Sequence, residues 1–335
     1  MMRKEKLLEI NNLEVSFLTD FGKVNAVRGI SFNVSTGETL GIVGESGCGK
    51  SVTALSILKL LEPSSAEIEG KIAYNQMNIT NFTDSEMEKI RGAEISMVFQ
   101  DPMSSLNPTM KIGHQLFDTL IKHEKSSRKE AKKTVLKMLE SVGINDVETV
   151  FNKYPHELSG GMQQRIMIGI ALICKPKLLI ADEPTTSLDV TIQAQLLSLM
   201  KDLKNKLNTS IILITHDLGV VANMADRILV MYAGKIVESG TVEDIFYHPK
   251  HPYTVALLGA IPRMDLGFNQ KLLEIKGYPP DLIDMKPGCA FAKRCMYSMV
   301  ICDEAEPLVF ECGDEHFVSC WLQHEYSPKI EKYNS

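Results

Sequence analysis

The stretch Gly44-Glu45-Ser46-Gly47-Cys48-Gly49-Lys50-Ser51 carries the strongest structural signal in the chain. It follows a short apolar run at 39–43 that is typical of a buried strand, and it precedes residues 51–61, where leucines recur at helical spacing. Glycines in such a loop let consecutive backbone N–H groups converge on phosphate oxygens, and the helix that follows adds a partial positive charge. A plain glycine-rich turn is the alternative, but the strand-loop-helix order favours a phosphate-binding loop.

Two further groups of side chains fit nucleotide chemistry. Lys50 is expected to reach the β- and γ-phosphates, and Ser51 is expected to bind Mg²⁺. Farther along, the apolar run at 178–181 ends in two carboxylates, Asp182 and Glu183. We expect Asp182 to hold Mg²⁺ through water and Glu183 to orient and polarise an attacking water molecule. Two surface acids that merely end a strand are the alternative, which the phosphate-binding loop upstream makes less favourable.

Periodicity elsewhere predicts an α/β fold. Residues 7–43 have the alternating pattern of β structure, whereas the continuous apolar runs at 178–181 and 211–214 suit parallel strands covered on both faces. A hairpin is expected from 228–231 and 235–237. The chain is therefore predicted to contain a sheet with helices between its strands.

Residues 103–160 are more helical. Ser127 and Glu130 form a capping-box pattern ahead of an apolar helix face that stops at Gly143. After about residue 262 the composition of the chain changes, and prolines and cysteines indicate a small, loop-rich appendage.

Composition excludes several classes of protein. The formal net charge is −6, which does not favour a nucleic-acid binder. No apolar run is long enough to span a membrane, and the first residues do not resemble a signal peptide. Seven cysteines in a chain of this kind argue against a disulfide framework.

Five segments together resemble the motifs of ABC ATPases and stand in that family's order. They are Gly44–Ser51 (Walker A), Phe99–Pro102 (Q-loop), Leu158–Arg165 (signature), Ala181–Asp189 (Walker B and D-loop) and Thr215–Asp217 (H-loop). The resemblance covers roughly residues 7–245. It implies a P-loop NTPase fold, with a RecA-like core, an antiparallel β subdomain and a helical subdomain.

The same resemblance implies a role for each motif. In this family two such domains face each other head to tail, and each ATP lies between the P-loop of one subunit and the signature of the other. Gln100 would sense Mg²⁺, and His216 would contact the γ-phosphate. Phe17 is the best match to the aromatic residue that stacks on adenine, although Phe21 is an alternative and either could belong to the core. The implied catalytic residues are Glu183, His216 and Gln100; the implied nucleotide-binding residues are Phe17, Gly44, Ser46, Gly47, Gly49, Lys50, Ser51, Asp182, Ser159, Gly160, Gly161 and Asp189; and the implied Mg²⁺ ligands are Ser51, Gln100 and Asp182.

A subfamily is indicated by segments outside the shared motifs. Three of these segments resemble those of the dipeptide/oligopeptide permease ATPases: Gln100–Pro108, His156–Met162 and His251–Thr254. Within that group, the form of the signature that has Met162 resembles that of the D-type subunit. Nickel importers of the same group share much of this pattern. The resemblance implies a nucleotide-binding domain at 1–262, with a helical subdomain at about 103–160, and a C-terminal Cys-rich extension at 263–335.

The implied assembly is an importer in the cell membrane, and this chain would be its peripheral subunit at the cytoplasmic face. Its partners would be two transmembrane permease subunits, a second, F-type ATP-binding subunit that forms a heterodimer with this chain, and, indirectly, a substrate-binding protein outside the cell membrane. No nucleic acid is expected. The cofactors would be ATP and Mg²⁺.

Cysteines at 289, 295, 302 and 320 crowd the last part of the chain. Four thiolates can hold a 4Fe-4S cluster or a zinc ion. The close Cys pairs common in structural zinc sites are missing, and Gly288-Cys289-Ala290-Phe291 with Arg294-Cys295 matches the permease pattern, in which these cysteines coordinate an iron-sulfur cluster. Reduced thiols without a ligand are the alternative. Cys312 lies outside the pattern.

Two other functions compete with peptide import. A non-transport ABC ATPase in DNA repair would insert a long coiled coil before the signature, and one in translation usually carries two nucleotide domains; neither feature is present here. A nucleotide-binding redox sensor is the second rival, and the presence of both Glu183 and His216 argues against a mere binding module.

Overall fold

The computed structural model describes residues 5–101, 105–124, 126–186, 189–260, 275–283, 285 and 287–330. Contacts divide the chain into two compact units. Unit 1 contains residues 1–9, 33–39 and 73–214, and unit 2 contains residues 10–32, 40–72 and 215–335. Each unit is assembled from segments far apart in the sequence, so each is described by itself.

Unit 1 contains three parallel strands that lie side by side in the order β8-β7-β6. They are β6 (Ile95–Val98), β7 (Leu178–Asp182) and β8 (Ser210–Thr215). Every residue of β7 and β8 is buried, which confirms the predicted parallel strands covered on both faces. Strand β6 was not predicted, because its four residues are too few to show a period.

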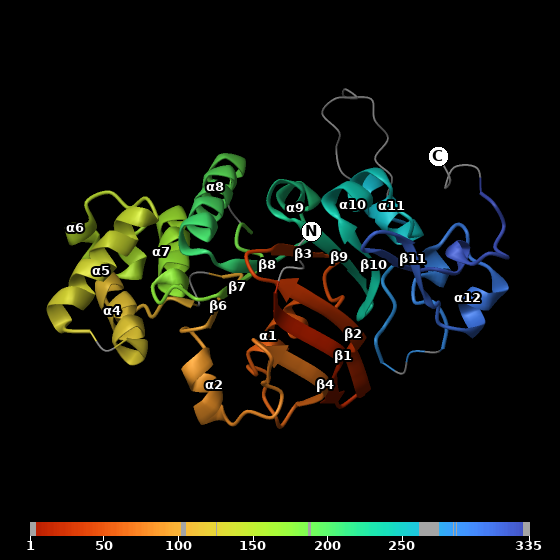
Figure 1. Cartoon of the computed structure of the whole chain (residues 1–335), viewed down its shortest axis with the longest axis horizontal. Helices are drawn as coiled ribbons and strands as arrows, with labels where there is room; N and C mark the ends of the chain where they lie inside the picture. Colours follow the sequence, from red (N-terminus) through yellow and green to blue (C-terminus); the bar gives the residue numbers. More distant parts are fainter. Residues whose placement is uncertain are drawn as a thin grey trace. The chain divides into compact units, whose positions relative to one another are not determined.

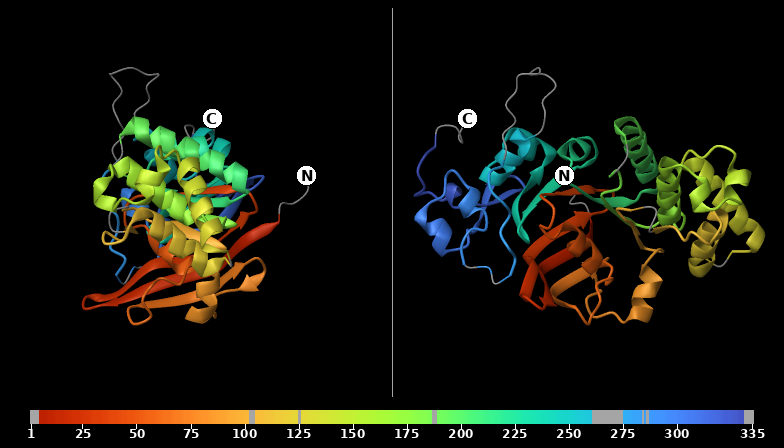
Figure 2. Two further views of the ribbon diagram at one scale, coloured as in Figure 1. Left: turned by 90° about the vertical axis from the view of Figure 1, so that its left-hand side faces the viewer. Right: turned by 180° about the vertical axis from the view of Figure 1, so that it is seen from behind.

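The helices α4 to α7 of unit 1 pack against one another, and Figure 2 shows them gathered together. Their bounds are α4 Ile112–His123, α5 Arg128–Ser141, α6 Val147–Phe151 and α7 Gly160–Leu172, with the 3-10 turn η1 at Pro155–Glu157. Unit 1 also contains α2 (Asp84–Ile90), α8 (Val190–Leu207) and the short strand β5 (Met77–Asn78). Helical structure is thus confirmed for much of 103–160, and residues 102–104 and 125 lie outside the described residues.

Helix α5 begins and ends as its sequence predicts. The Ser127 hydroxyl accepts the N–H of Glu130 at 3.4 Å, and the Glu130 carboxylate accepts the N–H of Ser127 at 3.0 Å. Gly143, with φ +75°, follows the last turn and donates its N–H to the carbonyl of Glu140 at 2.9 Å. The buried face consists of Ala131, Val135, Met138 and Leu139.

Unit 2 contains most of the strands β1 (Lys6–Thr19), β2 (Gly22–Ser35) and β4 (Ala66–Tyr74), which are neighbours in the order β2-β1-β4. It also contains five strands in the order β11-β12-β10-β9-β3 (Figure 1). These are β3 (Thr39–Val43), β9 (Arg227–Tyr232), β10 (Lys235–Thr241), β11 (Val309–Gly313) and β12 (His316–Ser319). Strands β9 and β10 form the predicted hairpin, around Ala233 and Gly234 with φ of 48° and 79°.

Helix α1 (Lys50–Ile57) follows β3 but is shorter than the predicted helix at 51–61. Lys59 adopts a left-handed conformation with φ of 50°, and the N–H of Leu60 donates to the carbonyl of Leu55 at 2.9 Å. This is the bond that ends a helix in a Schellman motif. Of the recurring leucines, Leu58 is buried at the end of α1, whereas Leu61 lies beyond the helix and is half-buried.

The C-terminal segment joins the sheet of unit 2, and a separate Cys-rich domain is not shown. Strand β12 pairs antiparallel with β10, with Glu238 opposite Val318 and Ser239 opposite Phe317. The unpaired edge of β10 is a ready template for this added hairpin. The loop-rich sequence predicted an appendage, because two strands of only five and four residues leave little periodic signal.

The remaining helices of unit 2 are α9 (Leu218–Met224), α10 (Val242–Tyr247), α11 (Pro252–Gly259) and α12 (Val300–Glu304), with 3-10 turns η3 (Ala292–Arg294) and η4 (Trp321–Gln323). One buried cluster joins Val43 of β3, Tyr232 of β9 and Tyr253 of α11 to Phe291 of the C-terminal segment. The loop that follows β3 and the Cys-bearing segment thus share a hydrophobic core. Among the described residues, no helix combines the length and apolar character needed to cross a bilayer.

Candidate nucleotide site and cysteine group

The glycines of the phosphate-binding loop in unit 2 fall into two kinds. A Cβ on Gly44 would lie 2.2 Å from the carbonyl oxygen of Met231, and one on Gly49 would lie 2.4 Å from the carbonyl oxygen of Ala26. Both positions also have positive φ, so only glycine fits them. A Cβ on Gly47 would meet nothing within 4 Å, because this residue faces outward. The outward face is therefore the one that can receive a phosphate.

The side chain of Lys50 is buried and binds the backbone of this loop. It is 5% exposed, and its Nζ donates to the carbonyl oxygens of Gly44 at 2.8 Å and Glu45 at 3.0 Å. Ser46 and Ser51 are exposed. Gly49 caps α1 without a side-chain hydrogen bond, which leaves the first turn open to an anion at its positive end.

Cys48 also lies in this loop, close to the beginning of α1, where a thiol can be unusually nucleophilic. Burial raises the pKa of the Cys48 thiol, and the nearby charge of Lys50 opposes this rise only in part. A thiol with a raised pKa is a poor nucleophile at neutral pH. The structure thus favours a spacer role for Cys48.

Glu183, whose carboxylate is predicted to be catalytic, directly follows β7 in unit 1. Glu183 has φ of 47°, and its N–H donates to the carbonyl of Ile214 at 2.8 Å. Its Oε2 accepts two hydrogen bonds, from the Gln100 amide and from the Thr186 hydroxyl, each at 2.9 Å. The fold thus brings Gln100 and Glu183 together, although 83 residues separate them.

Two aspartates flank this carboxylate. Asp182 is 6% exposed at the last position of β7. Asp189 precedes α8 and caps it, because its Oδ1 accepts the N–H of Ile192 at 2.9 Å. Ser187 and Leu188, between Glu183 and Asp189, lie outside the described residues.

The signature segment of unit 1 forms the beginning of α7. Ser159 is its cap, with Oγ accepting the N–H of Met162 at 3.4 Å. Ser159 and Gly160 are exposed, and a Cβ on Gly160 would meet nothing within 4 Å. Sequence reasoning missed Gln164, whose amide donates to the carbonyl of Pro184 and so ties α7 to the segment that carries Glu183.

His216 and Phe17 belong to unit 2. His216 is exposed and directly precedes Asp217, which caps α9 by accepting the N–H of Gly219 at 2.8 Å. Phe17 is half-buried on β1, whereas Phe21 is 88% exposed in the turn that follows. A stacking role for Phe17 stays a prediction.

The four predicted cysteines lie near one another. Burial raises the pKa of Cys289 to about 11, and the neighbouring thiols of Cys302 and Cys295 add to the rise. Burial raises the pKa of Cys320 to about 12, and the other three thiols add to it. For Cys312, burial also raises the pKa, but the further contributions come from charged residues and not from cysteines. Across the described ranges, however, no group of three or more His, Cys, Asp or Glu side chains could hold a metal ion.

An ion pair that the sequence did not predict connects the cysteine-bearing segment to the phosphate-binding loop. The Arg294 guanidinium binds both carboxylate oxygens of Glu45, at 2.7 and 3.0 Å. The pKa of Arg294 is raised above its usual value, chiefly because of the hydrogen bond with Glu45. The hydroxyl of Tyr253 accepts the backbone N–H of Glu45 at 2.9 Å. No local signal could reveal this contact, because 249 residues separate Arg294 from Glu45.

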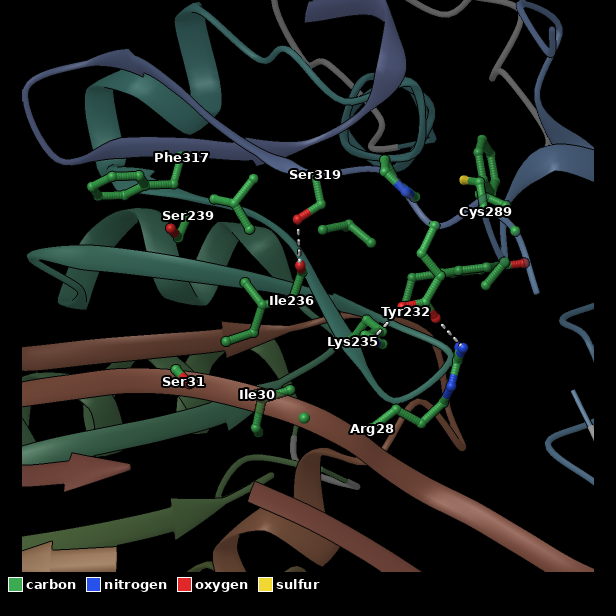
Figure 3. Close-up of a pocket in the computed structure, with 18 residues that line it drawn as sticks. Arg28, Ile30, Ser31, Tyr232, Lys235, Ile236, Ser239, Cys289, Phe317 and Ser319 are labelled. Carbon is green, nitrogen blue, oxygen red and sulfur yellow. Dashed lines mark hydrogen bonds and ion pairs between the residues drawn. The ribbon is translucent and has the colours of Figure 1, made fainter. Parts of the chain in front are cut away.

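A second cluster of charges borders a cavity of about 430 Å³ in unit 2 (Figure 3). Glu306 pairs with Arg28 at 2.5 Å and with Lys235 at 2.9 Å. Figure 3 shows Phe317 toward one end of the cavity and Cys289 toward the other. Glu306 therefore provides a second ionic connection between the C-terminal segment and the strands β2 and β10.

Two families match this chain. Residues 27–186 match the ABC transporter family, and residues 237–302 match the C-terminal region of oligopeptide/dipeptide transporters. The second match includes Cys289, Cys295 and Cys302 but not Cys320.

Individual proteins are similar over nearly the whole chain. The dipeptide transport ATP-binding protein DppD of Bacillus subtilis (strain 168) is 56% identical over 322 residues, which are 96% of each chain. The oligopeptide transport ATP-binding protein OppD of the same organism is 54% identical over 332 residues, covering 99% of this chain and 93% of that one. Among solved structures, a dimeric ATP-binding cassette with bound ADP and phosphate has a TM-score of 0.64 at 27% identity, covering 70% of this chain and 99% of that chain.

Proposed function

Because the chain belongs to the ATP-binding subunits of ABC transporters of the oligopeptide/dipeptide family, we infer that its ATP hydrolysis powers the import of dipeptides or oligopeptides. The full-length similarity to peptide-transport subunits carries this proposal, since the cassette fold alone is shared by transporters with other cargo. The relatives reported above are named for peptide transport, which favours peptides over nickel.

Uptake in cells tests the cargo. Cells that lack this chain should lose uptake of labelled dipeptides or oligopeptides and keep uptake of nickel. Restoring the wild-type chain should restore peptide uptake, and a Glu183→Gln chain should not. Loss of nickel uptake with normal peptide uptake would contradict the proposal.

Each nucleotide motif supports a distinct role. Lys50 and the outward face at Gly47 would bind the phosphates, with Ser51 and Asp182 as Mg²⁺ ligands. Glu183 would orient the attacking water, and its hydrogen bond with Gln100 supports a shared role at the Mg²⁺ and water. His216 would contact the γ-phosphate, and Phe17 would stack on adenine. These two roles rest on the family's motif pattern.

The exposed signature segment supports a paired arrangement. Ser159 and Gly160 present the capped end of α7 to solvent, where they can close over a nucleotide held by another subunit. The partners would be two transmembrane permease subunits and an F-type ATP-binding subunit, which would lie with this chain at the cytoplasmic face of the membrane. A substrate-binding protein would act on the other side of the membrane. Copurification from membranes tests this: the named subunits should accompany the chain, and the isolated chain should hydrolyse ATP poorly. Full, concentration-independent activity of a monomer would contradict it.

We further propose a 4Fe-4S cluster on Cys289, Cys295, Cys302 and Cys320. The proximity of the four thiols supports it, as does the position of Cys312 outside the group. In a four-iron cluster each thiolate binds a different iron, so the sulfurs need not converge on one point as they must around zinc. The raised pKa values favour neutral thiols in the metal-free chain, and thiolate ligation would release these protons.

Anaerobic purification tests the cluster. The protein should be brown and contain iron and sulfide, and a serine at any of the four positions should remove the colour. Cys312→Ser is the matched control and should keep it. Stoichiometric zinc without iron would contradict the cluster, and no metal at all would contradict a four-thiolate site.

A further inference from the structure

Glu45, the second residue of the phosphate-binding loop, is held in place by Arg294 from the C-terminal segment. The contact is bidentate, with Nη1–Oε2 at 2.7 Å and Nη2–Oε1 at 3.0 Å. The side chain of Arg294 is 6% exposed and that of Glu45 is 24% exposed. A planar fork on a carboxylate with so little solvent access fixes both position and orientation.

The guanidinium has a partner for each of its N–H donors. Besides the two bonds to Glu45, Nη1 donates to the Tyr232 hydroxyl at 3.2 Å, Nη2 to the carbonyl of Ile275 at 3.3 Å and Nε to the carbonyl of Lys276 at 3.1 Å. Its Cζ also lies 5.7 Å from the centre of the Tyr232 ring. Lysine has three donors and no fork, so it cannot reproduce this set.

Backbone hydrogen bonds made by Cys289 and Cys295 hold the turn that carries Arg294. The N–H of Ala292 donates to the carbonyl of Cys289 at 3.0 Å, and the N–H of Cys295 donates to the carbonyl of Ala292 at 3.1 Å. The N–H of Cys289 in turn donates to the carbonyl of Cys302 at 2.7 Å. The position of Arg294 therefore depends on the local structure of the cysteine-bearing segment.

On the loop side, Glu45 connects directly to the phosphate-binding lysine. The backbone carbonyl of Glu45 accepts Lys50 Nζ at 3.0 Å, and its backbone N–H donates to the Tyr253 hydroxyl at 2.9 Å. A side chain fixed by Arg294 thus restrains the backbone that places Lys50. We propose that Arg294 is a positioning residue that holds the phosphate-binding loop in its nucleotide-binding conformation, an inference that rests on the proposed phosphate-binding role of this loop.

Nucleotide affinity of the full chain tests this role, with a fluorescent ATP analogue in the presence of Mg²⁺ as the probe. Arg294→Gln should raise the Kd at least about tenfold, which corresponds to about 1.4 kcal/mol. In the assembled transporter the same variant should raise KM while kcat at saturating ATP changes little, because the lost interaction acts on binding. Arg294→Lys should rescue affinity only in part, since it restores charge without the fork.

Glu45→Gln breaks the same pair from the loop side and leaves the C-terminal segment intact. It should also raise the Kd, and the two changes combined should cost less than the sum of their separate effects. Glu306→Gln is the matched control, because it breaks a different ionic contact of the C-terminal segment and should leave the Kd unchanged.

A folded Arg294→Gln chain with wild-type Kd would overturn the inference, and so would effects that simply add. If Arg294→Gln does not fold, Glu45→Gln decides alone, and wild-type affinity of that variant would overturn the inference. Wild-type affinity of Lys50→Ala would instead overturn the phosphate-binding role of the loop itself.

Discussion

Replacing Gly47 by alanine separates the binding surface of the loop from its structural framework. Gly47 has φ of 79° and open space around a built Cβ, so the variant should lose only the cost of a left-handed residue, about 1–2 kcal/mol. At about 2–4 °C per kcal/mol, the melting temperature should fall by only a few degrees. The added methyl group would lie on the outward face, where it would compete with the phosphate that this loop is proposed to bind. The Kd for ATP should therefore rise at least about tenfold.

Gly37→Ala is the matched control for this strain. Gly37 has φ of 74°, and a Cβ there would lie 3.7 Å from its nearest neighbour, Asn208, in a turn outside the loop. It should melt like Gly47→Ala and bind ATP like the wild type. Gly44→Ala should be far less stable, because its Cβ overlaps the carbonyl of Met231 and overpacking adds about 1–3 kcal/mol or more.

The assays are thermal unfolding by circular dichroism and titration with a fluorescent ATP analogue. Wild-type affinity in Gly47→Ala would refute the argument that its outward face receives phosphate. An equal loss of affinity in Gly37→Ala would refute it as well, since strain alone would then explain the effect.

Three further predictions follow from charged groups. Glu183→Gln should bind ATP normally and lower the rate of hydrolysis in the assembled transporter by ~10²–10⁴-fold, because it removes the positioned base; a near wild-type rate would rule out that role. Lys50→Ala should weaken ATP binding itself, measured as Kd, because it removes the positive charge that is proposed to bind the phosphates. Burial lowers the pKa of His251 to about 4, so the unfolded chain binds more protons below about pH 6.5, and unfolding free energy should decrease as pH falls from about 6.5 to about 4. His251→Asn keeps a capping acceptor for α11 and should flatten that slope in urea titrations at several pH values; an unchanged slope would contradict the assignment.

Structural features whose causes lie within a few residues of one another were determined by the sequence itself. The loop at 44–51 could be predicted because Gly44, Gly47 and Gly49 adopt positive φ values, which are a local requirement for glycine, and because a strand and a helix adjoin the loop. The Ser127–Glu130 capping box was predictable for the same reason, since both of its hydrogen bonds span three residues. Strands β7 and β8 could also be predicted from the sequence, because strands covered on both faces appear as continuous apolar runs.

Contacts between distant segments were decided only by the tertiary structure. The pairing of Arg294 with Glu45 spans 249 residues, and the hydrogen bond between Gln100 and Glu183 spans 83. Strand β12 joined β10 because an unpaired sheet edge offers hydrogen bonds to any strand that can reach it, a possibility that leaves no periodic trace in sequence. Local patterns record which groups a residue needs beside it along the chain, whereas the partner of a buried charge depends on which segments the whole fold brings together.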